Sequence, residues 1–148
     1  MTVRSSVATW DGTIREGSGR MTIGRDVSER PYTFASRFDT GAGSNPEELI
    51  AAAHAGCFSM ALSGRLTRAN FPPKRIHTTA KVHLEVTPAG HEIKLIELDC
   101  EVEVAGISEA EFQEAAEGAK ANCPVSKALK AVEIKLKAKL ISPDAASI

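Results

Sequence analysis

The apolar positions of this chain are concentrated in one segment, which predicts a long buried helix. Between residues 49 and 66, 12 of 18 positions are apolar, whereas only 13 of the first 40 positions are. The most apolar run, residues 49–62, contains His54 and is shorter than the roughly 20 residues of a membrane span. A helix that is apolar nearly all round needs cover on several sides. Because the N-terminal part offers few apolar side chains, we expect a second subunit to supply part of that cover.

Both ends of this helix carry clear signals. Asn45 is a favourable N-cap, Pro46 suits the first helical position, and Glu48 stands three residues after the cap, as in a capping box. The sequence Phe71-Pro72-Pro73 cannot continue a helix, because proline lacks the backbone N–H that the next turn needs. The pattern therefore predicts a helix that begins at Pro46 and ends at about Arg68.

Apolar and polar residues alternate in three later segments, which predicts strands with one buried face. The first segment is residues 76–86, followed by a turn at Pro88-Ala89-Gly90. The second runs from Ile93 to about residue 104, and its apolar phase slips near Ile96, where we expect a β-bulge. The third is residues 132–140, in which lysines occupy the polar face.

The remaining elements complete an α+β pattern. Short alternating stretches at residues 3–10, 20–24 and 31–38, separated by glycine-containing turns, predict hairpin strands. Helices are expected at residues 109–121, after the capping box of Ser108 and Glu111, and at residues 124–131. The order of strands, helix, strands, helices and strand predicts an α+β fold with a mainly antiparallel sheet. The length of 148 residues predicts a single domain, residues 1–148.

Composition and charge exclude several classes of protein. Lysine and arginine number 18 and acidic residues 19, for a net charge of −1, so no overall positive field is available for nucleic acid. Hydrophobic residues make up 43% of the chain, which excludes a disordered protein. The first residues lack the apolar region of a secretory signal, so we expect a cytoplasmic protein that is not associated with a membrane.

Three cysteines are the candidate chemistry of this chain. Cys57, Cys100 and Cys123 are widely spaced with no CxxC pair, which argues against a disulfide framework and a tetrahedral zinc site. Cys100 lies in the inward phase of its strand, so we expect it to pack in the core. Cys57 stands mid-helix among small residues that leave room at its sulfur. Cys123 precedes Pro124 at a helix N-cap, where the backbone N–H groups and the helix dipole favour a thiolate.

Cys57 and Cys123 are either inert packing thiols or a reactive pair. A peroxidatic thiol attacks an O–O bond, becomes a sulfenic acid, and forms a disulfide with a resolving thiol. Near pH 7 a thiol with a pKa of about 8.5 is only a few per cent ionised, so the first thiol needs a cation such as arginine beside it. His54, three residues before Cys57, could be imagined as a metal ligand with the two thiols, but a structural histidine is the simpler interpretation.

At this point the residues resemble the OsmC/Ohr family of thiol peroxidases, more closely its OsmC branch, over nearly the whole chain. One departure is Gly56, where this family commonly has alanine. The segments that carry the resemblance are Arg37-Phe38, Asn45-Pro46-Glu47-Glu48-Leu49-Ile50, Ala52-Ala53-His54-Ala55-Gly56-Cys57-Phe58-Ser59-Met60-Ala61-Leu62 and Asn122-Cys123-Pro124-Val125-Ser126.

The resemblance implies an OsmC-like fold, in which mainly antiparallel sheets pack around a long central helix, and an intertwined homodimer with active sites at the interface. It implies a peroxidase that reduces organic hydroperoxides, and hydrogen peroxide more weakly, and is recycled by a lipoyl-type dithiol without a metal or other cofactor. Matched position by position, Cys57 is the peroxidatic cysteine and Cys123 the resolving one. Arg37 matches the arginine that activates the thiolate, and Glu47 matches the carboxylate that orients this arginine.

The helix geometry constrains this assignment. Glu47 and Cys57 are ten residues apart, which is about 15 Å along a continuous helix. One arginine could not easily contact both residues within one chain. We therefore expect either a site shared between two subunits or an interrupted helix. The alternative functions are a non-catalytic thiol redox sensor and a stress-response binding protein. Five apolar side chains are candidates for a substrate entrance or, equally, for core packing: Trp10, Phe34, Phe38, Phe58 and Met60.

Overall fold

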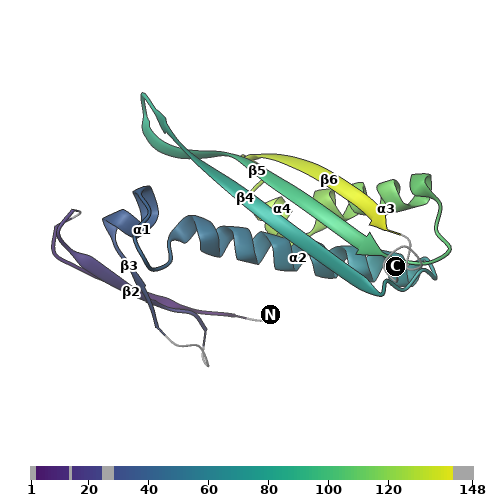
Figure 1. Cartoon of the computed structure of the whole chain (residues 1–148), viewed down its shortest axis with the longest axis horizontal. Helices are drawn as coiled ribbons and strands as arrows, with labels where there is room; N and C mark the ends of the chain where they lie inside the picture. The colour runs from purple at the N-terminus through teal and green to yellow at the C-terminus, as the bar shows by residue number, and fades with distance from the viewer. Residues whose placement is uncertain (1–2, 14, 25–28, 142–148) are drawn as a thin grey trace. The chain divides into compact units, whose positions relative to one another are not determined.

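The structure, a computed structural model, describes residues 3–13, 15–24 and 29–141 (Figure 1). The chain divides into two compact units, residues 1–49 and residues 50–148. The expectation of a single domain over residues 1–148 stays a prediction, and each unit is described by itself.

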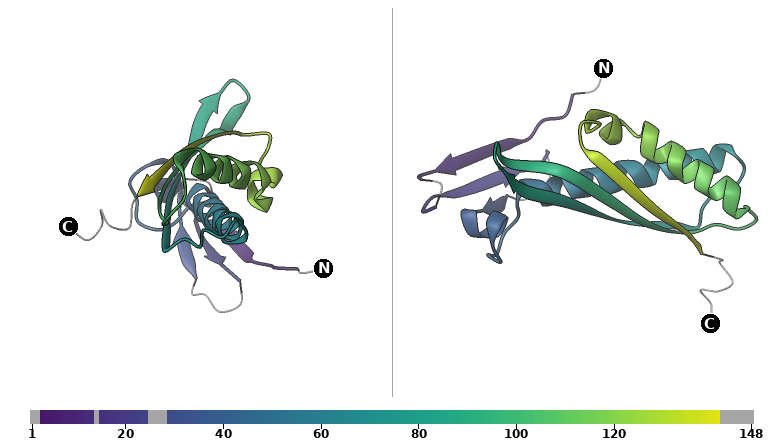
Figure 2. Two further views of the ribbon diagram at one scale, coloured as in Figure 1. Left: turned by 90° about the vertical axis from the view of Figure 1, so that its right-hand side faces the viewer. Right: turned by 90° about the horizontal axis from the view of Figure 1, so that it is seen from above.

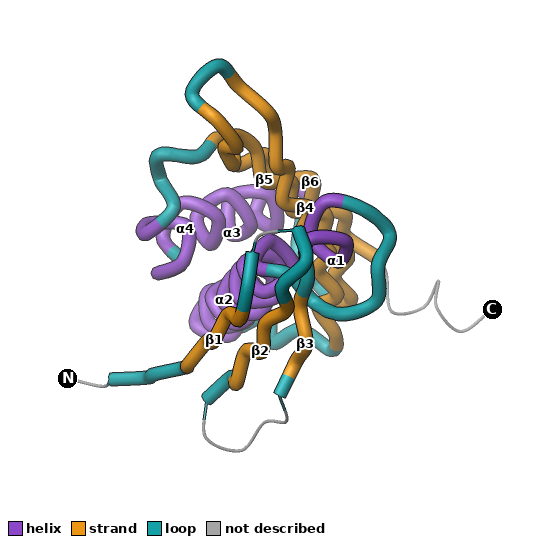
Figure 3. The backbone as a smooth tube through the Cα atoms, turned by 90° about the vertical axis from the view of Figure 1, so that its left-hand side faces the viewer, coloured by secondary structure: helices purple, strands orange, loops and turns teal. Residues whose placement is uncertain are grey.

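The first unit is built on a small antiparallel sheet. Its strands β1 (Val7–Asp11), β2 (Ser18–Thr22) and β3 (Arg30–Tyr32) lie side by side in that order (Figure 3). Gly19 of β2 lies under an aromatic pair, because a Cβ there would come within 2.4 Å of the Tyr32 ring and 2.7 Å of the Trp10 ring. The strands predicted at residues 3–10, 20–24 and 31–38 correspond to β1, β2 and β3 with shifted bounds, and β3 is shorter than predicted.

The prediction of a strand over residues 31–38 is wrong in its second half, which forms the helix α1 (Phe34–Phe38). Thr33 is its N-cap: the Thr33 hydroxyl accepts a hydrogen bond from the Ser36 backbone N–H, and Ser36 Oγ accepts one from the Thr33 N–H. This reciprocal pair satisfies two backbone donors at the helix start. A local capping box therefore decides the conformation where apolar alternation alone suggested a strand.

Helix α2 (Pro46–Arg68) has the predicted ends and is one uninterrupted helix. Asn45 caps it, because its Oδ1 accepts the Glu48 backbone N–H at 2.8 Å. At 23 residues and a mean hydropathy of 1.2 the helix is long and apolar enough to cross a membrane. However, one face of it is fully buried in the core of the second unit, through His54 and the three apolar residues Phe58, Leu62 and Leu66. Only 22% of the apolar span is buried within the chain.

One prediction follows from the exposed side of α2. Gly56 is exposed, and a Cβ built on it meets no atom within 4 Å. Because glycine in a helix interior costs roughly 0.5–1 kcal/mol relative to alanine, Gly56→Ala is expected to raise the free energy of unfolding by about that amount. Urea unfolding followed by circular dichroism measures it. Gly64→Ala is the control, since its Cβ would come within 3.2 Å of Arg68 Nη1 and gain less. A decrease in stability for Gly56→Ala would show that a group from outside the single chain packs against this residue and leaves no room for the added methyl group.

The second unit contains the larger sheet, made of β4 (Arg75–Thr87), β5 (Gly90–Glu103) and β6 (Glu133–Ile141) in that order. β4 and β5 pair antiparallel and β5 and β6 pair parallel. The predicted bulge is present. His83 pairs with Leu95 and Leu84 with Ile93, which leaves Lys94 unpaired, two residues before the predicted position.

Helices cover one face of this sheet. α2 and α3 (Glu109–Asn122) both lie on that face, as two perpendicular views show (Figure 2), and α4 (Pro124–Ala128) follows α3 directly. The core between the sheet and these helices is filled by every second side chain of β5 and by the buried face of α3. Its members from these two elements are Ile96, Leu98, Cys100, Val102, Phe112, Ala116 and Ala119. The helix N-cap predicted at Ser108 is confirmed, because its hydroxyl accepts the Glu111 N–H.

Candidate active site

The second unit brings two of the three cysteines together. Cys57 lies on α2 and is partly exposed, whereas Cys123 lies between α3 and α4 and is 1% exposed. Although 66 positions apart in the sequence, the two residues pack together in the core, and Cys123 lies near enough to Cys57 to raise the pKa of its thiol. All three cysteines of the chain carry free thiols in this structure. Two free thiols that lie near each other are candidates for a reversible disulfide.

Cys123 is held by the start of α4. It is the N-cap of this helix, as predicted from Pro124, and its sulfur accepts the Ser126 backbone N–H at 3.3 Å. Its Sγ also lies 3.1 Å from the Ser126 hydroxyl. Two contacts from one residue therefore fix the orientation of the Cys123 side chain.

The surroundings of Cys57 within the second unit disfavour its thiolate. Burial raises the pKa of the Cys57 thiol, a hydrogen bond from the Val125 backbone lowers it, and the neighbouring Cys123 thiol raises it again, with a net shift upward. Within the second unit, these three influences together disfavour ionisation of the Cys57 thiol at neutral pH.

Cys100 differs from both other cysteines. It is fully buried on β5, and burial, the largest cause, raises its pKa to about 11. A thiol with this pKa is almost entirely protonated at neutral pH, and a buried one is inaccessible to oxidants. The expected packing role of Cys100 is therefore confirmed by its position.

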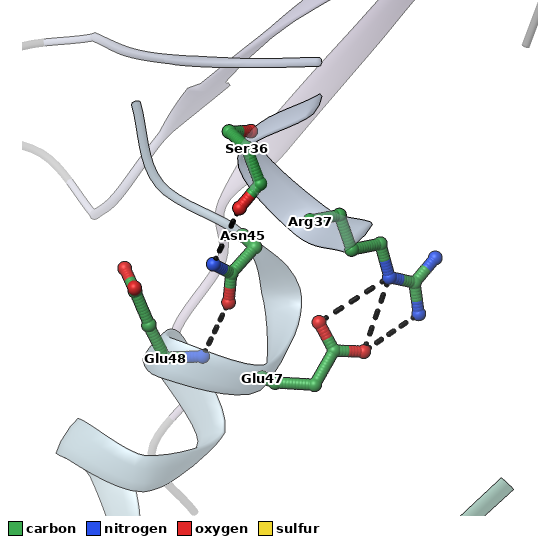
Figure 4. A network of polar contacts seen from close by, with 5 residues as sticks. All are labelled: Ser36, Arg37, Asn45, Glu47 and Glu48. Carbon is green, nitrogen blue, oxygen red and sulfur yellow. Dashed lines mark hydrogen bonds and ion pairs between the residues drawn. The ribbon is translucent and has the colours of Figure 1, made fainter. Parts of the chain in front are cut away.

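The first unit contains the predicted arginine and glutamate as an ion pair (Figure 4). Arg37 Nη2 donates to Glu47 Oε1 at 2.7 Å, and Arg37 Nε donates to Oε1 and Oε2 at 3.1 and 3.2 Å. Glu47 is 8% exposed, and the Arg37 side chain keeps 35% of its surface. A guanidinium held along one edge by a buried carboxylate has a fixed orientation and still has N–H donors left for another partner.

The chain around this pair explains its geometry. Asn45 Nδ2 donates to the Ser36 carbonyl at 3.0 Å while its Oδ1 caps α2 (Figure 4). Ser36 Oγ in turn donates to the carbonyl of Ser44. These contacts join the end of α1 to the start of α2, so that Arg37 on one helix faces Glu47 on the other. The structure thus brings the four predicted residues together as two pairs, one in each unit.

Two of the candidates for an apolar entrance, Phe58 and Met60, lie on opposite sides of α2. Phe58 is fully buried in the core of the second unit, so its role is packing. Met60, on the opposite side of α2, is 79% exposed. Near the ion pair, the Phe38 ring lies under the Arg37 guanidinium with 5.2 Å between centroid and Cζ, and it contacts the Phe34 ring.

A sequence model of the family described as OsmC-like protein matches residues 39–137 of the chain. Curated relatives named Peroxiredoxin OsmC from Escherichia coli (strain K12) and Shigella flexneri are each 49% identical over 125 residues, covering 84% of this chain and 87% of the relative. The chain belongs to the OsmC family. At this identity and coverage the family gives it a peroxidase-type redox function, and the enzyme class expected from the sequence is confirmed.

Solved structures of other OsmC-type proteins have the same fold. An organic hydroperoxide resistance protein from Elizabethkingia anophelis is 26% identical with a TM-score of 0.73, covering 95% of this chain and 99% of that one. An OsmC-like protein from Mycoplasma pneumoniae is 16% identical with a TM-score of 0.74, covering 95% and 98%. The predicted α+β, OsmC-like fold with mainly antiparallel sheets is confirmed.

One part of this OsmC-family site was not found from the sequence. The buried His54 contacts Ser126, and Ser126 contacts Cys123, so three side chains form a hydrogen-bonded series. Sequence reasoning gave His54 a structural role and Ser126 none. The signal that could have found Ser126 is its place three residues after an N-cap, where residues bond back to the cap. Among the described residues, no group of three metal-ligating side chains is arranged to hold a metal ion.

Proposed function

We propose that this protein is a cysteine-based peroxidase that reduces organic hydroperoxides, and hydrogen peroxide more weakly, to alcohols and water. The observation that carries the proposal is the proximity of the Cys57 and Cys123 thiols in the second unit, with Cys100 fully buried on β5. The Cys57 thiolate attacks the distal oxygen of ROOH: an S–O bond forms, the O–O bond breaks, and the alkoxide leaves as ROH after taking a proton. Cys57 is left as a sulfenic acid.

Cys123 completes the cycle as the resolving thiol. Its sulfur attacks the sulfenic sulfur of Cys57, an S–S bond forms, the S–O bond breaks, and water leaves. A dithiol reductant of the lipoyl type then exchanges with the Cys57–Cys123 disulfide and releases both thiols. The chemistry is carried by sulfur alone, so the proposal includes no metal or organic cofactor.

Arg37 is proposed as the cation that ionises Cys57, with Glu47 as the residue that orients it. Support comes from the raised pKa of the Cys57 thiol, which calls for a cation, and from the forked ion pair, which leaves guanidinium donors available. Because α2 is uninterrupted, the interrupted-helix alternative is wrong. The remaining alternative is a site in which the Arg37–Glu47 pair of one subunit serves Cys57 of the other.

A homodimer fits the surface of α2. The helix leaves a line of small and apolar residues exposed, including Ala52, Ala53, Gly56 and Met60, the last of which is 79% exposed. These positions follow helical spacing, and covering them would remove apolar surface from water. We propose that a second copy of the chain covers this line, that both units then act as one domain, and that the dimer works in the cytoplasm.

Steady-state kinetics tests the proposed function. With cumene hydroperoxide as oxidant and dihydrolipoamide as reductant, the protein is expected to turn over many times, with hydrogen peroxide a poorer substrate. A single stoichiometric oxidation without turnover would favour the redox sensor, which uses the same disulfide to change its partner contacts. Absence of any thiol oxidation by either peroxide would contradict both functions and favour a binding role.

Mass spectrometry locates the oxidised residues. After one equivalent of hydroperoxide, a disulfide between Cys57 and Cys123 is expected, while Cys100 stays free because it is buried and protonated. Peptide mapping under nonreducing conditions, with alkylation of free thiols, measures both. A disulfide that includes Cys100 would contradict the assignment of the pair.

A further inference from the structure

A buried histidine adjoins the Cys123 thiol through one intervening hydroxyl. His54 is fully buried on α2, and its Nε2 lies 2.7 Å from Ser126 Oγ. Ser126 is 5% exposed, and its Oγ lies 3.1 Å from Cys123 Sγ. His54 and Ser126 are 72 positions apart, so the contact exists only in the folded second unit. Neither side chain has a part in the steps described above.

The hydrogen-bonding capacity of the hydroxyl gives this series a direction. Ser126 Oγ has one hydrogen and two lone pairs. The Cys123 S–H donates to Ser126 Oγ, so the Ser126 O–H is left to donate to the other neighbour, His54 Nε2. This arrangement requires a neutral imidazole with a lone pair on Nε2. Burial supports it, because it lowers the pKa of His54 and keeps the ring uncharged at neutral pH.

The other ring nitrogen shows that the arrangement has an energetic cost. His54 Nδ1 is buried and has no hydrogen-bond partner among the described residues. Most buried polar groups are hydrogen-bonded, and leaving one unpaired costs on the order of 1–3 kcal/mol. A histidine that served only to fill the core would be replaced by an apolar side chain without that cost. The interaction through Nε2 is therefore the feature of His54 that needs an explanation.

We propose that His54, acting through Ser126, is a positioning residue for the resolving step: the two side chains orient the Cys123 thiol toward Cys57 and accept its proton as it attacks. The proposal rests on the proposed function and adds two residues to it. It concerns only the second chemical step, because Ser126 contacts the sulfur of Cys123.

The step balances as follows. The Cys123 proton passes to Ser126 Oγ while the Ser126 hydroxyl proton passes to His54 Nε2. The Cys123 sulfur forms the S–S bond with the sulfenic sulfur of Cys57, and the S–O bond of the sulfenic acid breaks. The hydroxide that leaves takes up the proton held by His54, returned through Ser126. The products are one disulfide and one water, and the imidazole is neutral again.

Single-turnover kinetics separates the two chemical steps. Each variant is mixed with one equivalent of cumene hydroperoxide, the sulfenic acid is trapped with dimedone at set times, and mass spectrometry measures sulfenic acid and disulfide. For Ser126→Ala, Cys57 oxidation is expected within about twofold of the wild-type rate, while disulfide formation slows by about 10- to 100-fold and dimedone adduct accumulates. Ser126→Thr, which keeps a hydroxyl, is expected to restore most of the rate.

Two further variants distinguish the roles. His54→Gln keeps an acceptor for the Ser126 hydroxyl but does not take up a proton, so disulfide formation is expected to slow although Cys57 oxidation does not. Ser59→Ala is the matched control: it removes a serine hydroxyl from α2 that bonds to Thr78 Oγ1 at 2.8 Å, and it is expected to change neither step. Thermal unfolding verifies that each variant is folded. If His54→Gln is not folded, the Ser126→Ala and Ser126→Thr pair decides alone.

The possible failures are distinguishable. Disulfide formation at the wild-type rate in Ser126→Ala would overturn this inference and leave the proposed function intact. An equal slowing in Ser126→Ala and Ser126→Thr would also overturn it, because a hydroxyl would then not be the required group. If the wild-type protein forms neither sulfenic acid nor disulfide, the proposed function itself fails.

Discussion

Replacing Cys57 by serine is expected to abolish hydroperoxide consumption, with a loss of more than about a thousandfold. The serine hydroxyl is a far weaker nucleophile than a thiolate toward an O–O bond, and neither other cysteine is placed to replace it. Cys123 is 1% exposed and Cys100 is fully buried. Stopped-flow measurement of peroxide consumption, with the reductant in excess, gives the rate.

Cys123→Ser is expected to have a different effect, because it removes the second step and leaves the first. One equivalent of hydroperoxide is consumed at close to the wild-type rate, and turnover then stops. Without a resolving thiol, the Cys57 sulfenic acid remains exposed to a second equivalent, which oxidises it to the sulfinic acid. Intact-mass measurement detects the added oxygens. Equal loss of the first step in Cys57→Ser and Cys123→Ser would contradict this division of labour.

Cys100→Ala is the matched control for both variants. It removes a cysteine from the same unit, but one whose thiol is buried in the core and protonated. Both chemical steps are expected to be retained, while the free energy of unfolding falls by about 1 kcal/mol from the lost packing. A loss of peroxidase activity in this variant, with the protein still folded, would show that Cys100 takes part in the chemistry.

Elements with one buried face were predicted well from the sequence. The alternation in β6 survives in the structure, where Lys135, Lys137 and Lys139 are exposed and the residues between them are half-buried. The phase slip in β5 marked a real bulge, because a change of face requires an extra residue in one strand. It lies at Lys94, since periodicity locates such a slip only to within a few residues. The ends of α2 followed from Asn45 and Pro72, whose effects are local.

Contacts between residues far apart in the sequence could not be predicted from the periodicity of apolar positions. Nothing in the spacing of His54 and Ser126 predicts that they touch, because the contact depends on how α4 packs against α2. Arg37 and Glu47 were identified from the family resemblance and not from the hydrophobic pattern, since a single arginine near a loop is typical of an exposed surface residue. In the structure the pairing has a local cause, the Asn45 and Ser36 hydrogen bond between α1 and α2. The helix α1 itself was missed because its capping box lies inside an apolar alternation.

Arg37→Met is expected to lower peroxidase activity at pH 7 by on the order of a hundredfold and to shift the pH profile upward. Burial and Cys123 hold the pKa of the Cys57 thiol above its ordinary value. If Arg37 is the cation that opposes this effect, its removal leaves the thiol with the raised pKa. The ionised fraction falls about tenfold for each pH unit below the pKa, so the loss is large at neutral pH and is recovered as the pH rises toward ionisation of the thiol.

The measurement is the rate of Cys57 oxidation between about pH 5 and about pH 10, a range that spans the ordinary thiol pKa. Two further variants of arginine distinguish the effect of the charge from the effect of the side-chain geometry. Arg37→Lys keeps the charge but loses the fork that holds Glu47, so a smaller shift with incomplete recovery is expected. Arg20→Met is the control, because it removes an arginine of the first unit whose ion pairs among the described residues, with Asp11 and Glu29, are exposed. Its profile is expected to match the wild type. An Arg37→Met profile with the wild-type midpoint would show that another group ionises Cys57, because loss of the cation must raise the thiol pKa.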